Sequence, residues 1–419
     1  MNILDTCDLA VIGGGAAGLM CAYTAAAEGC SVVVLDGNRQ AGRKLRITGK
    51  GRGNVTNRCG VEDFMKNIPG DGRFLYSALN RFSPEDTISF FEENGVPLKT
   101  ERGNRVFPVS DNANDLADCL FRLCRDAGVR FLRTRADSVL LSDGAVAAVH
   151  TAEGTVSCGA AALCTGGLSY PLTGSDGAGY IIARSLGHRV TELLPSLVPL
   201  ESDDPWCAEL QGFSLRNVTL RAYEDEKLIY RELGEMLFTH FGVSGPLVLS
   251  ASAHMRHFGS SRYRFEIDLK PGLDEEKLDA RILRDFAAAP NKQLVNILPG
   301  LVGRSMTPVI LQLSGVDGSV PVHDLTHEMR SKLRRLLKAF PVSVKGTRPV
   351  EEAIVTAGGV STKEVNPRTM ESKLVKGLYF AGEILDLDAY TGGFNLQIAW
   401  STGRVAGISV SKQFQRGNQ

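Results

Sequence analysis

The first 36 residues alternate between apolar runs and a segment of small side chains. A short apolar run, Leu9 to Ile12, ends in glycines, positions 16–27 are rich in alanine, and Ser31 to Leu35 is apolar again. Apolar runs of this length that are bounded by glycine are typical of strands in a parallel sheet. The pattern predicts a strand over 9–12, a helix over 16–27 and a second strand over 31–35.

The turn between the first strand and the helix has the spacing of a dinucleotide-binding fingerprint. Gly13, Gly15 and Gly18 form G-x-G-x-x-G, and Asp36 ends the second strand. In such a turn the first glycine bends the chain, the second lets a pyrophosphate approach, and the third lets helix and strand pack. The helix start offers N–H groups to phosphates, and Asp36 is placed to accept hydrogen bonds from a ribose. The fingerprint alone does not distinguish FAD from NAD.

A long cationic, glycine-rich segment follows the second strand and favours FAD. The stretch RKLRITGKGRGNVTN, residues 43–57, is too polar and too rich in glycine for a core strand. An NAD dehydrogenase needs only a short connection here, whereas cations can face phosphates and amides can hydrogen-bond a flavin edge or a ribityl chain. The spacing is not that of a Walker A loop. The candidates in this segment are Arg43, Lys44, Arg46, Lys50, Gly51, Arg52, Asn54, Thr56 and Asn57.

The C-terminal segment supplies a second set of candidate flavin contacts. Leu378 to Ala381 is apolar and predicts a strand, after which Glu383 brings a carboxylate that can accept a hydrogen bond from a ribityl hydroxyl. Gly392 and Gly393 open the last helix. The N–H groups at such a helix start can stabilise negative charge on a reduced flavin. This pair of glycines therefore marks the end of the chain where we expect the flavin ring.

The spacing of apolar residues changes twice in the middle of the chain. SPEDTISFFEENG predicts a helix that begins after Ser83 with Pro84 at its first position, and NANDLADCLFRLCRDAG predicts another helix. From about His188 short alternating runs, among them KLIYREL and EMLFTH, predict a barrel-like set of strands. Apolar positions three and four apart then predict helices. We expect an FAD-binding domain over 1–190 and 350–419, a β-barrel-like substrate domain over 191–270 and 338–349, and a helical insert over 271–337.

Composition excludes several classes of function. The chain has 419 residues, with 47 basic and 47 acidic side chains, so it carries no net charge to attract nucleic acid or a membrane surface. Its nine cysteines include no C-x-x-C pair, which favours reduced thiols and a cytoplasmic protein. No metal or hydrolase motif is present. We expect a small-molecule substrate and no nucleic acid, membrane or metal, while the oligomeric state stays open.

Five stretches, spread in order over nearly the whole chain, carry a resemblance to a known family. They are VIGGGAAGL, GRKLRITGKGRGNVTN, TGGLSYPLTGSDGAGY, LFTHFGVSGP and the long block from TAGGV to AWSTG. The chain closely resembles the BaiN/RdsA family of FAD-dependent oxidoreductases, also called HI0933-like flavoproteins. The resemblance implies an α/β fold, in which a Rossmann-like FAD-binding domain, split in sequence, carries an inserted β-barrel and a small helical domain. At Gly53 relatives often carry cysteine, so we expect no redox cysteine there.

The resemblance also implies an activity. It indicates an FAD-dependent reductase or dehydrogenase that acts on C=C bonds of a small organic or steroid-like substrate of the 3-oxo bile acid type. Because only one complete fingerprint exists, a donor such as NAD(P)H would have to dock transiently. The alternatives are an FAD-dependent amine oxidase of the aminoacetone type, which releases H2O2, and a tRNA-associated flavoprotein. Reduction of a polarised C=C bond needs a proton donor, and the candidates are Tyr170, His240 and Tyr390.

Motifs and resemblance together give one set of expected cofactor-binding residues. Ala136, Thr165 and Gly166 come from the resemblance alone. The full set is Gly13, Gly15, Ala16, Ala17, Gly18, Asp36, Arg43, Lys44, Lys50, Gly51, Asn54, Thr56, Asn57, Ala136, Thr165, Gly166, Gly382, Glu383, Gly392, Gly393, Phe394, Asn395 and Leu396.

Overall fold

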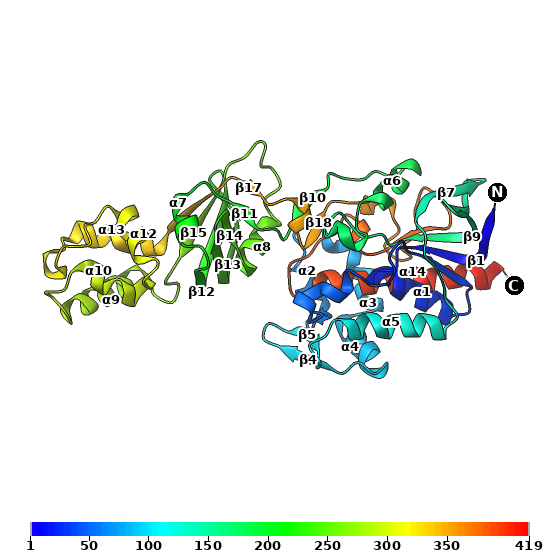
Figure 1. Ribbon diagram of the computed structural model, residues 1–419, viewed down its shortest axis with the longest axis horizontal. Helices are drawn as coiled ribbons and strands as arrows, with labels where there is room; N and C mark the ends of the chain where they lie inside the picture. Colours follow the sequence, from blue (N-terminus) through cyan, green and yellow to red (C-terminus); the bar gives the residue numbers. More distant parts are fainter. Residues whose placement is uncertain (1, 418–419) are drawn as a thin grey trace. The chain divides into compact units, whose positions relative to one another are not determined.

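The computed structural model describes residues 2–417, which fall into two compact units (Figure 1). Unit 1 contains the chain up to Ser196 and again from Val350 onward, and unit 2 is Leu197–Pro349. The chain therefore leaves unit 1 once and returns to it once. Among the described helices none alone is long and apolar enough to cross a membrane, although the pair Leu294–Val302 and Thr307–Ser314, bent by 114°, meets that test of length and composition together.

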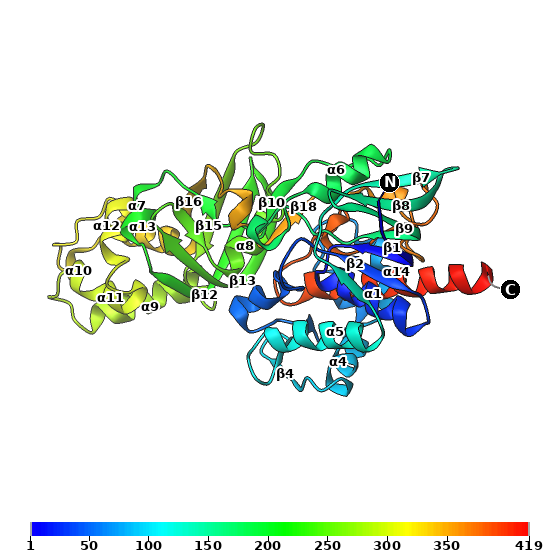
Figure 2. The ribbon, with the colours of Figure 1, turned by 45° about the vertical axis from the view of Figure 1, so that its right-hand side comes forward.

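Unit 1 is built on a seven-stranded sheet, of which β2, β1, β9, β8 and β7 are labelled in Figure 2. Its path is β6 (Arg130–Leu132), β2 (Val32–Leu35), β1 (Ile3–Ile12), β9 (Gly154–Leu163), β8 (Ala145–Thr151) and β7 (Ala136–Ser142), with β19 (Leu378–Phe380) paired to the second half of β9. The strands β6, β2, β1, β9 and β19 are parallel, and β7 and β8 form an antiparallel hairpin. The strand predicted at 9–12 is the C-terminal part of β1, and the strand predicted at 31–35 contains all of β2.

Two helices, α1 (Ala16–Ala27) and α14 (Phe394–Gly417), run side by side along this sheet (Figure 1, Figure 2). They approach closely because α14 presents glycines to α1. A Cβ atom on Gly403 would lie 2.5 Å from the carbonyl oxygen of Ala17, and one on Gly407 would lie 2.7 Å from that of Cys21. Only glycine fits at such distances from backbone. The contact places the start of α14 beside the glycine turn that precedes α1.

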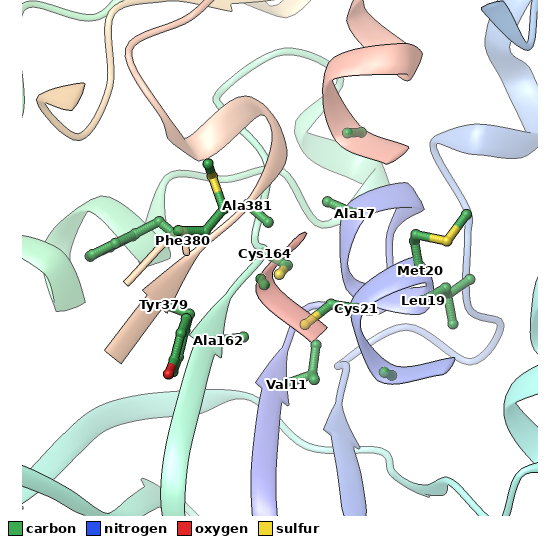
Figure 3. Close-up of a cluster of buried hydrophobic side chains, with 14 of the residues drawn as sticks. Val11, Ala17, Leu19, Met20, Cys21, Ala162, Cys164, Tyr379, Phe380 and Ala381 are labelled. Carbon is green, nitrogen blue, oxygen red and sulfur yellow. The ribbon is translucent and has the colours of Figure 1, made fainter. Parts of the chain in front are cut away.

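The core of unit 1 lies between these helices and the strands. Figure 3 shows Val11 of β1, Cys21 of α1 and Phe380 of β19 within one buried cluster. A hydrogen bond to Cys164 and burial raise the pKa of the Cys21 thiol well above its usual value, so this thiol stays protonated. All nine cysteines are free.

The remaining elements of unit 1 confirm two predicted helices. Helix α4 begins after Ser83, whose hydroxyl accepts from the Asp86 N–H while the Asp86 carboxylate accepts from the Ser83 N–H. The stretch NANDLADCLFRLCRDAG forms α5, which contacts α1. The further helices of unit 1 are α2 (Val61–Met65), α3 (Tyr76–Arg81), α4 (Pro84–Glu93), α5 (Asn114–Asp126) and α6 (Ala178–Ser185). A three-stranded sheet has the order β3 (Thr56–Asn57), β5 (Arg105–Pro108) and β4 (Leu98–Glu101). A two-stranded sheet pairs β10 (Leu194–Ser196) with β18 (Val355–Ala357).

Unit 2 holds one seven-stranded sheet and a set of helices. The described pairings follow the path β16 (Phe340–Val344), β15 (Tyr263–Asp268), β12 (Ser214–Glu224), β13 (Lys227–Thr239), β14 (Gly242–Ser244), β11 (Leu200–Glu201) and β17 (Gly346–Thr347). The segments KLIYREL and EMLFTH, predicted as two strands, form the single strand β13. The helices are α7 (Pro205–Glu209), α8 (Pro246–Ser252), α9 (Glu275–Ala287), α10 (Leu294–Ile297), α11 (Pro299–Val302), α12 (Thr307–Ser314) and α13 (His327–Lys338).

Candidate cofactor site

The expected cofactor residues of unit 1 gather where parallel strands end. Gly13 follows β1, Asp36 follows β2, Thr165 follows β9 and Glu383 follows β19. Because these strands are parallel neighbours in the order β2, β1, β9 and β19, their carboxyl ends share one edge of the sheet. Ligands of open α/β sheets bind at this edge.

The glycine turn has the shape that a diphosphate requires. A Cβ on Gly13, whose φ is 103°, would lie 2.6 Å from the Cys164 carbonyl oxygen, and a Cβ on Gly18 would lie 1.9 Å from that of Gly13. These two glycines are therefore needed by the fold itself. At Gly15 nothing lies within 4 Å of the Cβ position, so the space in front of the α1 start is open. The residues fit the role of each glycine in the fingerprint.

Asp36 lies at the carboxyl edge of the sheet and also stabilises the glycine turn after β1. One of its carboxylate oxygens accepts a hydrogen bond from the Gly14 N–H at 2.8 Å, and the other accepts from the backbone and side-chain nitrogens of Asn38 at 2.8 and 3.0 Å. The Asn38 amide also donates to the Thr173 carbonyl at 2.9 Å. Each carboxylate oxygen can accept more than one hydrogen bond, so a ribose contact stays a prediction. Asn38 was missed by the motif because it lies beyond the strand end.

Two of the cations in the 43–57 segment are bound to acidic residues of unit 1. Arg46 pairs with Asp118 of α5 at 2.7 Å. Arg52 pairs with Glu101 and Asp111, each at 2.5 Å. These contacts correct the prediction that Arg46 and Arg52 face phosphates, because their guanidinium groups hold the loop against α5 and the β4–β5 hairpin. Arg43 and Lys50 are exposed, and the segment from Leu45 to Gly51 is a kinked 3-10 turn in which Gly49, Lys50 and Gly51 have positive φ.

Lys44 also differs from its expected role. Its ammonium donates to the Ser169 hydroxyl at 2.6 Å and to the Glu383 carboxylate at 2.7 Å. The same carboxylate accepts from the Thr356 N–H at 3.0 Å. Lys44 was expected at the phosphates, and the structure instead ties it to the residue that was expected at the ribityl chain. Ser169 and Thr356 were missed by sequence reasoning, although Ser169 lies inside the family-like stretch TGGLSYP.

The polar residues near the end of the segment divide into two groups. Thr56 is fully buried and donates to Gln397 of α14 at 2.6 Å, which corrects its assignment to a flavin edge. The Asn54 amide, oriented to suit its neighbours, accepts from the Gly393 N–H at 3.0 Å. Asn57 donates to the carbonyls of Gly103 and Gly392. This segment therefore lies directly against the start of α14.

The start of α14 keeps the free N–H groups that were expected. No described hydrogen bond uses the backbone N–H of Phe394, Asn395 or Leu396, as is usual for the first turn of a helix. A Cβ on Gly393 would lie 2.4 Å from Thr56 backbone, so only glycine lets the two segments touch. The Asn395 side chain is used within the protein, because it accepts from the Ala389 N–H at 2.9 Å and donates to its carbonyl at 2.6 Å. The contribution left for Asn395 is its backbone N–H.

The loop after β9 contains a polar atom without a partner. The Thr165 hydroxyl is buried and has no hydrogen-bond partner within the described structure. A buried hydroxyl without a partner is costly, and Thr165 was expected to close on the cofactor. Gly166 follows with a positive φ and lies next to Ser175. Ala136 begins β7 opposite Thr151. The free hydroxyl, the open space at Gly15 and the free N–H groups at α14 together fit an extended dinucleotide.

A polar cavity of about 370 Å³ lies beside the start of α14. Asn57, which is 6% exposed, lines it together with the half-buried Cys59. Burial, followed by the charge of Asp63, raises the pKa of the Cys59 thiol to about 11, so Cys59 is not a thiolate nucleophile at neutral pH. The other lining residues are Asp63, Asn67, Gly103, Asn104, Arg105, Thr391, Gly392 and Phe394. Amides and one guanidinium dominate this wall, and Phe394 is its one aromatic side chain.

The three candidate proton donors have different surroundings. Tyr170 has the left-handed φ of 53°, is 38% exposed and lies with its ring centroid 5.9 Å from the Lys44 ammonium. Tyr390 belongs to the loop that Asn395 holds before α14. His240 lies in unit 2, exposed, in the turn between β13 and β14. Tyr170 is thus the one that the structure places beside the Lys44–Glu383 pair.

A family comparison decides what kind of protein carries this site. The model of the family described as HI0933-like protein Rossmann domain matches residues 7–409. The chain belongs to the HI0933-like family. It is an FAD-dependent oxidoreductase of mixed α/β fold, as the motifs predicted.

Three similar proteins extend this comparison. The chain is 30% identical to a 3-dehydro-bile acid delta(4,6)-reductase of Clostridium scindens, over 97% of this chain and 99% of that protein. It is 32% identical to a ribosomal RNA dihydrouridine synthase of Escherichia coli, over 95% and 96%. Among solved structures, a 3-ketosteroid-delta4-(5alpha)-dehydrogenase of Rhodococcus jostii matches with a TM-score of 0.52 and 17% identity, over 99% and 98%. This last likeness supports the fold.

Proposed function

We propose that this HI0933-like protein reduces a C=C bond conjugated to a carbonyl group, with FAD held along the carboxyl edge of the unit 1 sheet. When bound, FAD supplies hydride transfer. The observation that carries the proposal is the set of unsatisfied groups along one edge: the open space at Gly15, the free hydroxyl of Thr165 and the free N–H groups of Phe394 to Leu396. The open space at Gly15 suits the diphosphate, and the Thr165 hydroxyl suits the part of FAD between the diphosphate and the ring. The free N–H groups at the start of α14 suit the flavin ring.

The two curated relatives point to a common reaction. A bile acid with a 3-oxo group and a delta(4) bond, and a uridine base, both contain a C=C bond conjugated to a carbonyl group. Such a bond is polarised, so one carbon accepts hydride and its neighbour then needs a proton from an acid. Tyr170 is our first candidate for this acid, because its strained backbone and its place near Lys44 are features that functional residues share.

The first candidate substrate is a steroid-like 3-oxo acid, with NAD(P)H as the transient donor. It is supported by the bile acid reductase, which matches this chain nearly end to end. The second candidate is a uridine in RNA. It is supported by the dihydrouridine synthase and by the amide-rich wall of the cavity at Asn57, since amides suit the donor and acceptor edge of a base. The balanced charge of the chain favours the first candidate.

One anaerobic experiment tests the reaction and separates the substrates. The purified yellow protein is reduced with NADH or NADPH while the flavin band at about 450 nm is followed. A 3-oxo-4-ene bile acid, or a uridine-containing ribosomal RNA fragment, is then added without oxygen. Recovery of the band with a gain of about 2 Da in one of these compounds identifies the substrate. If neither compound reoxidises the flavin, and aminoacetone reduces it with peroxide released on aeration, the proposal is wrong and the protein is an oxidase.

A further inference from the structure

The Lys44–Glu383 pair joins four segments of unit 1 that are far apart in sequence. Glu383 follows β19, and its carboxylate accepts from the Lys44 ammonium, from the Ser169 hydroxyl and from the Thr356 N–H. The Thr356 hydroxyl in turn accepts from the Leu168 N–H at 2.8 Å. The loop after β2, the loop after β9, β18 and the end of β19 therefore meet at one carboxylate.

The pair is half-buried and well satisfied. The side chains of Lys44 and Glu383 are 22% and 19% exposed. The surroundings leave little freedom, because a Cβ on Gly167 would lie 2.9 Å from the nearer Glu383 oxygen and 2.4 Å from the Thr356 hydroxyl. Glycine at position 167 is therefore needed for the loop to reach the carboxylate. A partly buried ion pair with several hydrogen bonds holds its members in one orientation.

The position of the pair in the sheet separates it from the diphosphate turn. Glu383 follows β19, whereas the glycine turn follows β1, and β9 lies between these two strands. Two strand spacings correspond to roughly 10 Å. A cofactor that lies extended along the edge from Gly15 would bring its ribityl chain, rather than its phosphates, to Glu383.

We propose that Lys44 is a positioning residue that aims the Glu383 carboxylate at the ribityl chain of FAD and does not bind the diphosphate. This inference rests on the proposed FAD site. It assigns a partly buried cation of the 43–57 segment, 22% exposed, to the ribityl half of the cofactor. Lys44 acts through Glu383. Its removal is therefore expected to weaken the binding only of ligands whose ribityl chain contacts Glu383.

Apoprotein titrations with two ligands test this role. FAD contains adenosine, the diphosphate, the ribityl chain and the flavin ring. ADP contains the adenosine and the diphosphate but has no ribityl chain and no ring. For Lys44→Met we expect the FAD dissociation constant to rise about tenfold or more and the ADP dissociation constant to stay within about twofold of the unmodified protein. Glu383→Gln is expected to show the same selectivity. Because Lys44 acts through Glu383, Lys44→Met/Glu383→Gln should bind FAD no worse than Glu383→Gln alone.

The opposite results would overturn the proposal. If Lys44→Met weakens ADP and FAD by the same factor, or if its loss of FAD affinity adds in full to that of Glu383→Gln, then Lys44 is a phosphate ligand. Lys44→Arg keeps the charge and replaces Lys44→Met in the experiment if the Met variant does not fold. A loss of FAD affinity with an unchanged ADP affinity supports the positioning role of Lys44. Equal losses of affinity for the two ligands contradict it. Failure of the unmodified apoprotein to bind either ligand would instead reject the FAD site itself.

Discussion

Gly13 and Gly15 are two positions apart and are expected to respond oppositely to the same substitution. Gly13→Ala places a side chain at a φ of 103° and 2.6 Å from a carbonyl oxygen, so we expect it to lower the free energy of unfolding by at least about 2 kcal/mol. Gly15→Ala meets open space at an ordinary φ of −81°, so its stability should stay within about 0.5 kcal/mol. The new methyl group would nevertheless block the approach of a diphosphate. Denaturant unfolding and FAD titration of both variants check this contrast, and normal FAD affinity in Gly15→Ala would place the diphosphate elsewhere.

His188 makes the stability of unit 1 depend on pH. Its side chain is fully buried, its Nε2 lies 2.9 Å from the Ser372 hydroxyl, and its Nδ1 lies 3.2 Å from the Glu364 carboxylate without the alignment of a hydrogen bond. Burial lowers the pKa of His188, and the Glu364 charge opposes this only in part. The unfolded chain therefore binds a proton on this residue at a higher pH than the folded chain does.

The expected result is a loss of stability as the pH falls. The free energy of unfolding should decrease once the pH passes below about 6.5, by up to about 1.4 kcal/mol per pH unit, until the lowered pKa of folded His188 is reached. His188→Gln removes the titration, so the difference between about pH 7.5 and about pH 5.5 should shrink in that variant. Urea unfolding at both pH values measures it. An equal decrease in both proteins would show that other groups are responsible.

At the scale of elements, helix α4 depends on its first turn. Ser83 and Asp86 form a reciprocal capping box, and the helix packs Phe91 against Trp400 of α14 with ring centroids 5.5 Å apart. We expect Ser83→Ala to lower the free energy of unfolding by about 1 kcal/mol, because an N–H of the first turn loses its acceptor. Ser83→Thr keeps the hydroxyl and is the matched control. Thermal melting of both variants is the measurement, and equal melting temperatures would mean that the cap contributes nothing.

Elements with strong local signals could be predicted from the sequence, and contacts between distant segments could not. Helix α1 has the predicted bounds, and Ser83 and Pro84 begin α4 as expected, because capping and glycine spacing act within a few residues. Arg52 was misassigned because its partners, Glu101 in β4 and Asp111 after β5, lie 49 and 59 residues later in the chain. The local pattern of the 43–57 segment is the same whether its cations meet phosphates or carboxylates. Only the tertiary fold decides between them.

At the scale of the whole molecule, the insertion of unit 2 suggests which part of the chain suffices for FAD. Unit 1 is left at Ser196 and re-entered at Val350, and these points are close because Ser196 of β10 pairs with Val355 of β18. The Gly15 turn, Thr165, Glu383 and the start of α14 all belong to unit 1. The groups that we assign to the cofactor are therefore retained if residues 197–349 are replaced by a short glycine linker.

We expect this shortened protein to bind FAD with an affinity within about tenfold of the full chain, because no proposed cofactor contact is removed. It should lack reductase activity if unit 2 contributes to substrate binding, as its exposed His240 and the predicted substrate domain suggest. Unit 2 alone, residues 197–349, is the control and should stay colourless. Absorbance of the two purified fragments after incubation with FAD, with circular dichroism to establish that each is folded, decides the matter. A folded but colourless unit 1 would mean that the groups of unit 1 named above do not suffice to hold the cofactor.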